Sequence, residues 1–128
     1  MSLTNAFETS TLQYLLTTGS VTRPTAWYVG LFTSDPTDTG TAGTEVSGSG
    51  YARVAATFSV TGDTASNTAS IEFPAASGGN WGTIGWIGIM DASSGGNMII
   101  HSALDTAKAI NDGDVFRIPT GDLDITAS

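Results

Sequence analysis

The residue types that most often carry catalysis are sparse in this sequence. The 128 residues include one histidine, His101, and no cysteine. The lack of cysteine excludes disulfide bonds, thiolate nucleophiles and zinc–thiolate sites. A hydrolase could use His101 with a serine and an aspartate, but no nucleophile-elbow motif accompanies it. We therefore predict a satisfied surface or interface histidine, and we predict no catalytic residue and no bound cofactor.

Paired aspartates are the candidate metal ligands, and they occur at positions 35 and 38, 112 and 114, and 122 and 124. Calcium needs about six to eight oxygen ligands that converge from a shaped loop. The pair around Gly113 lacks the further ligands of an EF-hand, and Asp-Gly is itself a hairpin signal. The last pair alternates with apolar residues, which is typical of the solvated face of a strand. We predict turns and a solvated face here, and no metal.

Three tryptophans and one tyrosine could form a platform for stacking a sugar ring. Trp27 and Trp86 lie in the most apolar segments, which favours core packing for both. Trp81 follows a Gly-Gly-Asn turn and is the best candidate for exposure. An exposed tryptophan more often anchors a protein–protein contact than a sugar. We therefore expect an interface that includes Trp81 and Tyr51.

Basic residues are few, and two of the four are Arg53 and Arg117 in predicted strands. On an acidic protein they are expected to pair with carboxylates, either within the chain or across an interface between chains. The predicted interface residues are accordingly Trp81, Tyr51, Arg53, Thr44 and Glu45.

The net charge limits which classes of partner the protein is expected to bind. The formal net charge of −8 comes from 4 basic and 12 acidic residues. Such a field repels nucleic-acid backbones and anionic lipid, so we expect no nucleic-acid partner and no membrane partner. The first ten residues show neither the basic nor the apolar region of a classical signal peptide. No apolar run approaches the roughly 18 to 20 residues of a membrane span.

One helix is expected, over residues 5–18. Asn5 is placed to cap it, and Glu8 follows three positions later as in a capping box. Phe7, Thr11 and Tyr14 recur at helical spacing, and Gly19 is well placed as the stop.

Beyond the helix the apolar period changes to two, which indicates strands. We expect strands within residues 25–33, 51–60, 69–73, 83–90, 98–104, 115–118 and 123–125. Their number and spacing predict a single mainly-β domain over residues 1–128: a β-sandwich or barrel-like fold of about seven to eight strands with one N-terminal helix. Residues 37–50 form a long loop of Thr, Gly and Ser with no core of its own. If ordered, this loop is expected to rest on a neighbouring subunit or on a capsid lattice.

Seven segments carry a family likeness, in the same order and over nearly the whole chain. They are TAWYVGLFTSDPT at 25–37, TEVSG at 44–48, GYAR at 50–53, EFPAA at 72–76, WGT at 81–83, GIMDA at 88–92 and GDVFRIP at 113–119. Together these segments resemble a family of small phage and prophage virion proteins that are commonly labelled tail fibre proteins. The resemblance implies a structural component of the virion and brings no catalytic residues.

Physical arguments order the possible virion roles. A long fibre is not expected from 128 residues in one unit without a heptad or collagen-like repeat. A compact acidic domain suits a capsid decoration (cement) protein, which we rank first. A small tail fibre or tail-associated protein is the alternative, and a carbohydrate- or receptor-binding module is a third. The expected partners are further copies of the chain, as a homotrimer, with the major capsid protein or tail proteins. We expect assembly in the bacterial cytoplasm and final residence in the virion.

Overall fold

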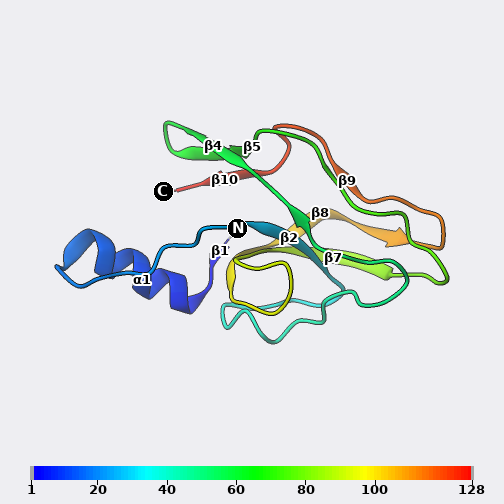
Figure 1. The fold of residues 1–128 in the computed structure, drawn as a ribbon, viewed down its shortest axis with the longest axis horizontal. Helices are drawn as coiled ribbons and strands as arrows, with labels where there is room; N and C mark the ends of the chain where they lie inside the picture. The colour runs from blue at the N-terminus through cyan, green and yellow to red at the C-terminus, as the bar shows by residue number, and fades with distance from the viewer. Residues whose placement is uncertain (1, 128) are drawn as a thin grey trace.

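A long antiparallel pair organises the molecule. In the computed structural model, which describes residues 2–127, β7 (Gly82–Met90) pairs with β8 (Met98–Ile110). On its other side β7 pairs with β2 (Tyr28–Phe32). The short strands β1 (Ser2–Leu3) and β3 (Val54–Ala55) complete a five-stranded sheet in the order β1-β8-β7-β2-β3. This sheet forms the base of the molecule in Figure 1.

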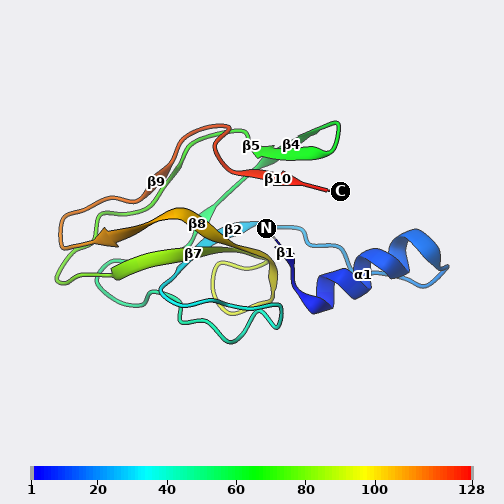
Figure 2. The same ribbon diagram turned by 180° about the vertical axis from the view of Figure 1, so that it is seen from behind.

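Two smaller antiparallel sheets lie over one face of this base. One has the order β10-β5-β4, from β4 (Phe58–Thr61), β5 (Thr64–Asn67) and β10 (Asp124–Thr126). The other pairs β6 (Ile71–Glu72) with β9 (Arg117–Ile118). Figure 2 shows the same layering from behind, with the β4–β5 hairpin and β10 at the end of the body that carries the helix.

The core fills the space between the layers. The side chains of a strand alternate between its two faces, so Val29 and Leu31 of β2 face the core with Ile87 and Ile89 of β7. The remaining core comes from the covering layer and from the ends of the long strands. It includes Val46, Ile71, Phe73, Ala76, Trp81, Ile84, Ile99, Ile110, Phe116 and Leu123.

The opposite face of the sheet carries a second, smaller apolar cluster. It consists of Phe32, Met90 and Met98, with Tyr28 and Trp86 packed against it. Gly30 and Gly88 pair with each other across β2 and β7 on this face. A Cβ atom on Gly88 would lie 2.6 Å from Met98 Cε and 3.0 Å from Phe32 Cε1. This glycine therefore permits the close packing over it, as expected for a glycine within a strand.

The helix α1 (Asn5–Leu16) begins at residue 5, as predicted, but the predicted capping box does not start it. Its N-cap is Thr4, and no side chain caps the helix. The Thr4 hydroxyl instead donates a hydrogen bond to the Met98 carbonyl at 2.7 Å, and the Thr4 N–H donates to the Ile99 carbonyl at 3.0 Å. Thr4 is buried. The predicted capping role of Asn5 is wrong, because the start of the helix is anchored to β8.

The loop that follows β2 is held by its own chain, contrary to the expectation that it needs a neighbour. The N–H of Thr33 donates to the Thr44 carbonyl at 2.9 Å, and the N–H of Val46 donates to the Leu31 carbonyl at 3.0 Å. In the first part of the loop, the Asp38 carbonyl accepts a hydrogen bond from the N–H of Asn5 at 2.8 Å. Backbone bonding therefore orders this loop where apolar side chains are scarce.

The mainly-β fold with one N-terminal helix is confirmed, and the described strands form several antiparallel sheets without closing into a barrel. Ten strands occur among the described residues, rather than about seven or eight. The difference comes from β1 and β5, which lie outside the predicted segments, and from residues 51–60, where the one predicted strand is divided into β3 and β4. The helix ends at Leu16 instead of residue 18.

Gly43 should tolerate no side chain, because a Cβ there would lie 2.7 Å from the Ser34 carbonyl oxygen and 2.8 Å from the Pro36 Cα. These are backbone atoms, so relief requires movement of the loop. We expect Gly43→Ala to destabilise the protein by about 1 to 3 kcal/mol, measured by thermal unfolding. Gly85→Ala is the matched control, since a Cβ at Gly85 meets no atom within 4 Å. Equal melting temperatures for the two variants would contradict the packing argument.

Candidate functional site

The predicted interface residues converge at the outer edge of β2, beyond the two residues that β3 covers. The Leu31 N–H on this edge donates to the Tyr51 hydroxyl at 3.0 Å. The backbone of residues 44–46 takes the neighbouring positions through the two loop bonds described above, and Glu45 forms an isolated β-bridge with Phe32. A side-chain hydroxyl and a loop therefore replace the missing strand.

An ion pair joins this edge to the next loop. Arg53 binds Glu45 in a bidentate manner, with Nε to Oε2 at 2.8 Å and NH2 to Oε1 at 2.7 Å. Arg53 NH1 also donates to the carbonyls of Ala92 and Gly95, at 2.9 and 2.8 Å. The Tyr51 hydroxyl donates to Glu45 Oε2 at 2.6 Å. We call Glu45, Tyr51 and Arg53 the clamp, since they tie residues 44–53 to residues 92–95.

The surroundings of the clamp shift the titration of all three groups. Burial raises the pKa of Glu45, but hydrogen bonds from Arg53 and Tyr51 outweigh it, so that the pKa is lowered overall. Burial and the bond to Glu45 raise the pKa of Tyr51 above its ordinary range. The bond to Glu45 likewise raises the pKa of Arg53. The clamp is therefore a charged pair with a neutral phenol at neutral pH.

Trp81 is buried, so the prediction that it is the exposed tryptophan is wrong. Its side chain is only 5% accessible, and its Nε1 donates to the Ser49 carbonyl at 2.9 Å. Ser49 reaches this position because its φ of 51° lies in the left-handed region, between Gly48 and Gly50, which share that region. Tyr51 meets the Trp81 ring edge-on, at 5.4 Å between centroids. The buried indole thus has an internal polar partner, as a buried tryptophan usually does.

The other two tryptophans also differ from expectation. Trp27 is 37% exposed, so its predicted place in the core is wrong, because it precedes β2 and lies outside the sheet. Trp86 is half-buried and packs against the smaller cluster on the outer face of the sheet. The three tryptophans and Tyr51 therefore do not gather into one exposed platform.

His101 contacts a carboxylate of the long loop. Its Nε2 lies 2.9 Å from Asp38 Oδ1, and its side chain is mostly buried while that of Asp38 is half exposed. The neighbouring Ser102 hydroxyl donates to the Ala103 carbonyl instead of the imidazole. His101 thus has the partner expected of a satisfied histidine, and its lack of a catalytic role stays a prediction.

Two of the six aspartates named as candidate ligands, Asp35 and Asp114, accept bonds within their own turns. Asp35 Oδ1 accepts from the Thr37 N–H at 2.9 Å, and Asp114 Oδ2 accepts from the Asn111 N–H at 2.9 Å. Among the described residues no group of three or more metal-binding side chains occurs, and no helix has the length and apolarity to cross a membrane.

The arrangement holds loops and offers little free chemistry. A shallow polar hollow of about 410 Å³ lies beside the clamp, between residues 45–53 and 93–95. Arg53, its one cation, already makes four hydrogen bonds to Glu45 and to two carbonyls. For Arg53 the sequence left open a carboxylate partner in the same chain or in another chain, and the structure shows a partner in the same chain, Glu45. Sequence reasoning missed the carbonyls of residues 92 and 95, since backbone acceptors leave no mark in a residue pattern.

Comparison with known protein families gives one match. Residues 2–126 match the family model described as "Podophage GP4 fiber I protein gp80". A search of curated proteins gives no match.

The clamp predicts an acid-sensitive contribution to stability. The pKa of Glu45 is lower in the folded chain than in the unfolded chain. Its contribution is therefore present above the ordinary glutamate value and is lost as the pH falls through the lowered folded value. We expect Glu45→Gln to cost about 2 kcal/mol at pH 7, with the difference from wild type shrinking below about pH 4. Urea unfolding across this range measures it.

Glu72→Gln is the control for this prediction, because Glu72 is exposed and forms no salt bridge among the described residues. It should change stability by less than about 0.5 kcal/mol at any pH. A Glu45→Gln deficit that stays constant down to pH 3 would show that the carboxylate charge is not what stabilises the clamp.

Proposed function

Because the chain belongs to this podophage fibre family, and is thus a phage structural protein and a virion component, we propose that it is a non-enzymatic fibre subunit. The observation that carries the proposal is the match over residues 2–126. The clamp supports it, since the best-organised polar cluster of the molecule fastens loops to the sheet. We further propose that the protein assembles in the host cytoplasm and acts through protein–protein contacts.

Assembly with further copies is part of this proposal. One body of 128 residues without an internal repeat is too short to form a fibre alone. Several copies must therefore join, and we propose a homotrimer that attaches to tail or capsid proteins. Closed cyclic symmetry is the usual form of such assemblies.

Capsid decoration, which the sequence analysis ranked first, is the second candidate. The layered body with a continuous core favours it, because such a domain covers a lattice position better than it extends a shaft. We rank the fibre role ahead of it because the family description names a fibre protein. A carbohydrate- or receptor-binding module is third, and the exposure of Trp27 is its main support.

Labelling of purified virions should distinguish the first two candidates. We expect antibody–gold particles to mark discrete projections in negative-stain micrographs, with a low copy number relative to the major capsid protein by gel densitometry. Virions that lack the gene provide the control for antibody specificity. Even label over the whole capsid, with a copy number close to that of the capsid protein, would instead establish decoration.

The non-enzymatic part of the proposal makes its own prediction. His101→Ala should leave phage titre within about threefold of wild type, because His101 has only Asp38 as a side-chain partner among the described residues. Plaque assays on the complemented phage measure this, with Asp38→Asn as the matched variant that breaks the same contact. A titre loss of several orders of magnitude for His101→Ala alone, with normal particle content, would point to catalysis.

A further inference from the structure

The helix and the segment after it leave an apolar surface uncovered. We call residues 5–24 the arm, and it projects from one end of the body (Figure 1). No residue of α1 is buried. Leu12, Leu15 and Leu16 are 58%, 67% and 77% exposed. Three exposed leucines on one short helix form an apolar patch of the kind that marks an interaction site.

One side of the helix combines these leucines with a charge. Glu8, Leu12, Leu15 and Leu16 fall at positions i, i+4, i+7 and i+8, which lie on one face of an α-helix. We call this the leucine face. Within the described residues Glu8 has no ion pair and no side-chain hydrogen bond.

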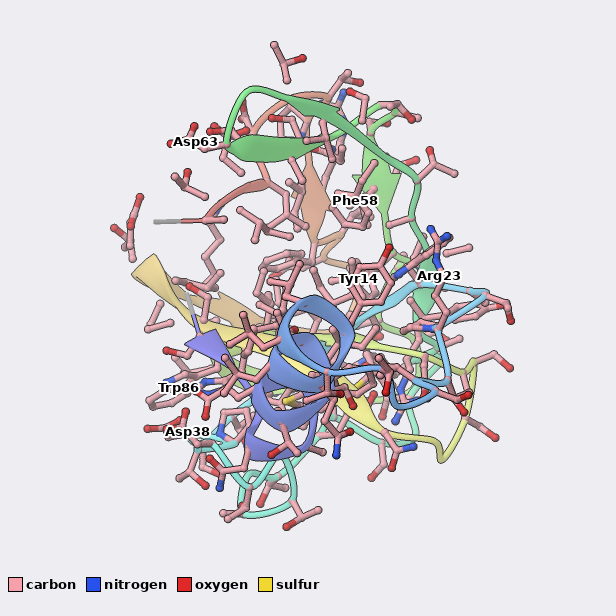
Figure 3. The ribbon with its side chains drawn as sticks, turned by 90° about the vertical axis from the view of Figure 1, so that its left-hand side faces the viewer. Tyr14, Arg23, Asp38, Phe58, Asp63 and Trp86 are labelled. Atoms are coloured by element: carbon pink, nitrogen blue, oxygen red, sulfur yellow. The ribbon has the colours of Figure 1, made fainter. Side chains whose placement is uncertain are left out.

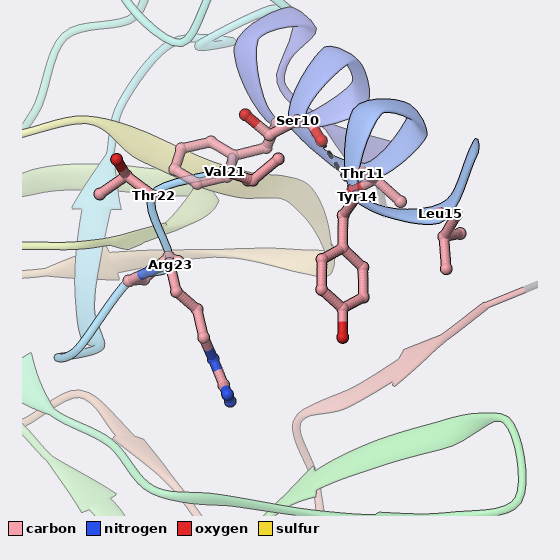
Figure 4. A pocket seen from close by; sticks show the side chains of 9 residues that line it. Ser10, Thr11, Tyr14, Leu15, Val21, Thr22 and Arg23 are labelled. Atoms are coloured by element: carbon pink, nitrogen blue, oxygen red, sulfur yellow. Dashed lines mark hydrogen bonds between the residues drawn. The ribbon is translucent and has the colours of Figure 1, made fainter. Parts of the chain in front are cut away.

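The neighbouring side of the helix borders a groove of about 440 Å³. Phe7, Thr11, Tyr14 and Leu15 of α1 line it together with Val21, Arg23 and Pro24, so Leu15 lies where the leucine face meets the groove. In Figure 4 the side chains of Tyr14 and Arg23 extend in the same direction from its two walls. The view along the arm in Figure 3 shows these two residues side by side. The arm therefore carries both a protruding apolar face and an apolar hollow.

The charges of the arm differ from those of the body. The arm has one acidic and one basic side chain, Glu8 and Arg23, so the formal charge of −8 falls entirely on the rest of the chain. Arg23 is exposed and has no salt-bridge partner among the described residues. Two acidic bodies repel each other, whereas two neutral arms approach without that cost.

We propose that the leucine face of one copy seats in the arm groove of a second copy, with Glu8 of the first meeting Arg23 of the second. This rests on the proposed assembly of several copies and names the surface that joins them. The two surfaces differ, so the contact is head-to-tail and closes when a ring of copies is complete. A trimer is such a ring. Each copy thereby covers its neighbour's apolar surface, and both of its arm charges, Glu8 and Arg23, gain a partner.

The apolar part of the proposal is tested on the purified full-length chain. Analytical ultracentrifugation at physiological salt should show a discrete oligomer. Leu12→Gln with Leu16→Gln should weaken self-association at least about tenfold, because it removes apolar anchors from the contact. Val115→Gln is the control, since Val115 is also an exposed apolar residue and lies outside the arm. Circular dichroism confirms that each variant is folded.

The charge part is tested by exchange. Arg23→Glu and Glu8→Arg should each weaken association by about tenfold, because each places like charges together. The double variant should restore the wild-type constant, since it reverses the pair and keeps the net charge of the chain. A merely structural role for either residue would give no such rescue.

Three results would overturn the inference: a monomer at all concentrations, leucine variants that associate like the Val115 control, or a double variant weaker than both single ones. A monomer with normal incorporation into virions would mean that another virion protein covers the arm. The labelling experiment reports on the fibre role independently, so the two proposals fail separately.

Discussion

The unpaired outer edge of β2 is the constraint on which the rest of the structure depends. A strand edge presents N–H and C=O groups that must find partners once they are enclosed. β3 pairs with only two residues of this edge. The phenol of Tyr51 and the backbone of residues 44–46 form hydrogen bonds with the edge residues that follow. Both are held in place by Glu45 and Arg53, so one ion pair supports the closing of the sheet.

This edge explains how a loop with few apolar residues becomes ordered. Within residues 37–50, only Val46 contributes a buried side chain, and its N–H is already bonded to β2. Charged hydrogen bonds add stability in a half-buried site, where water competes less than at the surface. The same side chains that first suggested an interface between chains therefore act inside one chain.

Much of the fold could be predicted from the residue pattern alone. The apolar, aromatic and β-branched content of residues 28–32 and 83–90 identified the central strands, and most of these residues are buried. The strand β1 and the anchoring of Thr4 on β8 could not be predicted, since both depend on partners almost a chain length away.

For the candidate site, the sequence identified residues that lie together, but it did not indicate that they hydrogen-bond to one another within one chain. The segments at 44–48 and 50–53 do meet, with Trp81 beside them. Trp81 was taken for exposed because it follows Gly-Gly-Asn, and its burial depends on a left-handed Ser49 that the sequence pattern does not indicate. Of the predicted helical stripe, Phe7 packs against the core, whereas Tyr14 is exposed.

The position of β1 has a consequence for the order in which the molecule folds. The β7–β8 hairpin joins neighbours in the sequence, and contacts of that kind form quickly. Ser2 pairs with His101, so that contact must close a loop of nearly the whole chain and forms late. The helix follows β1 directly and acquires its orientation only after the sheet exists. Translation presents the N-terminal residues first, yet their pairing with β8 is among the last contacts to form.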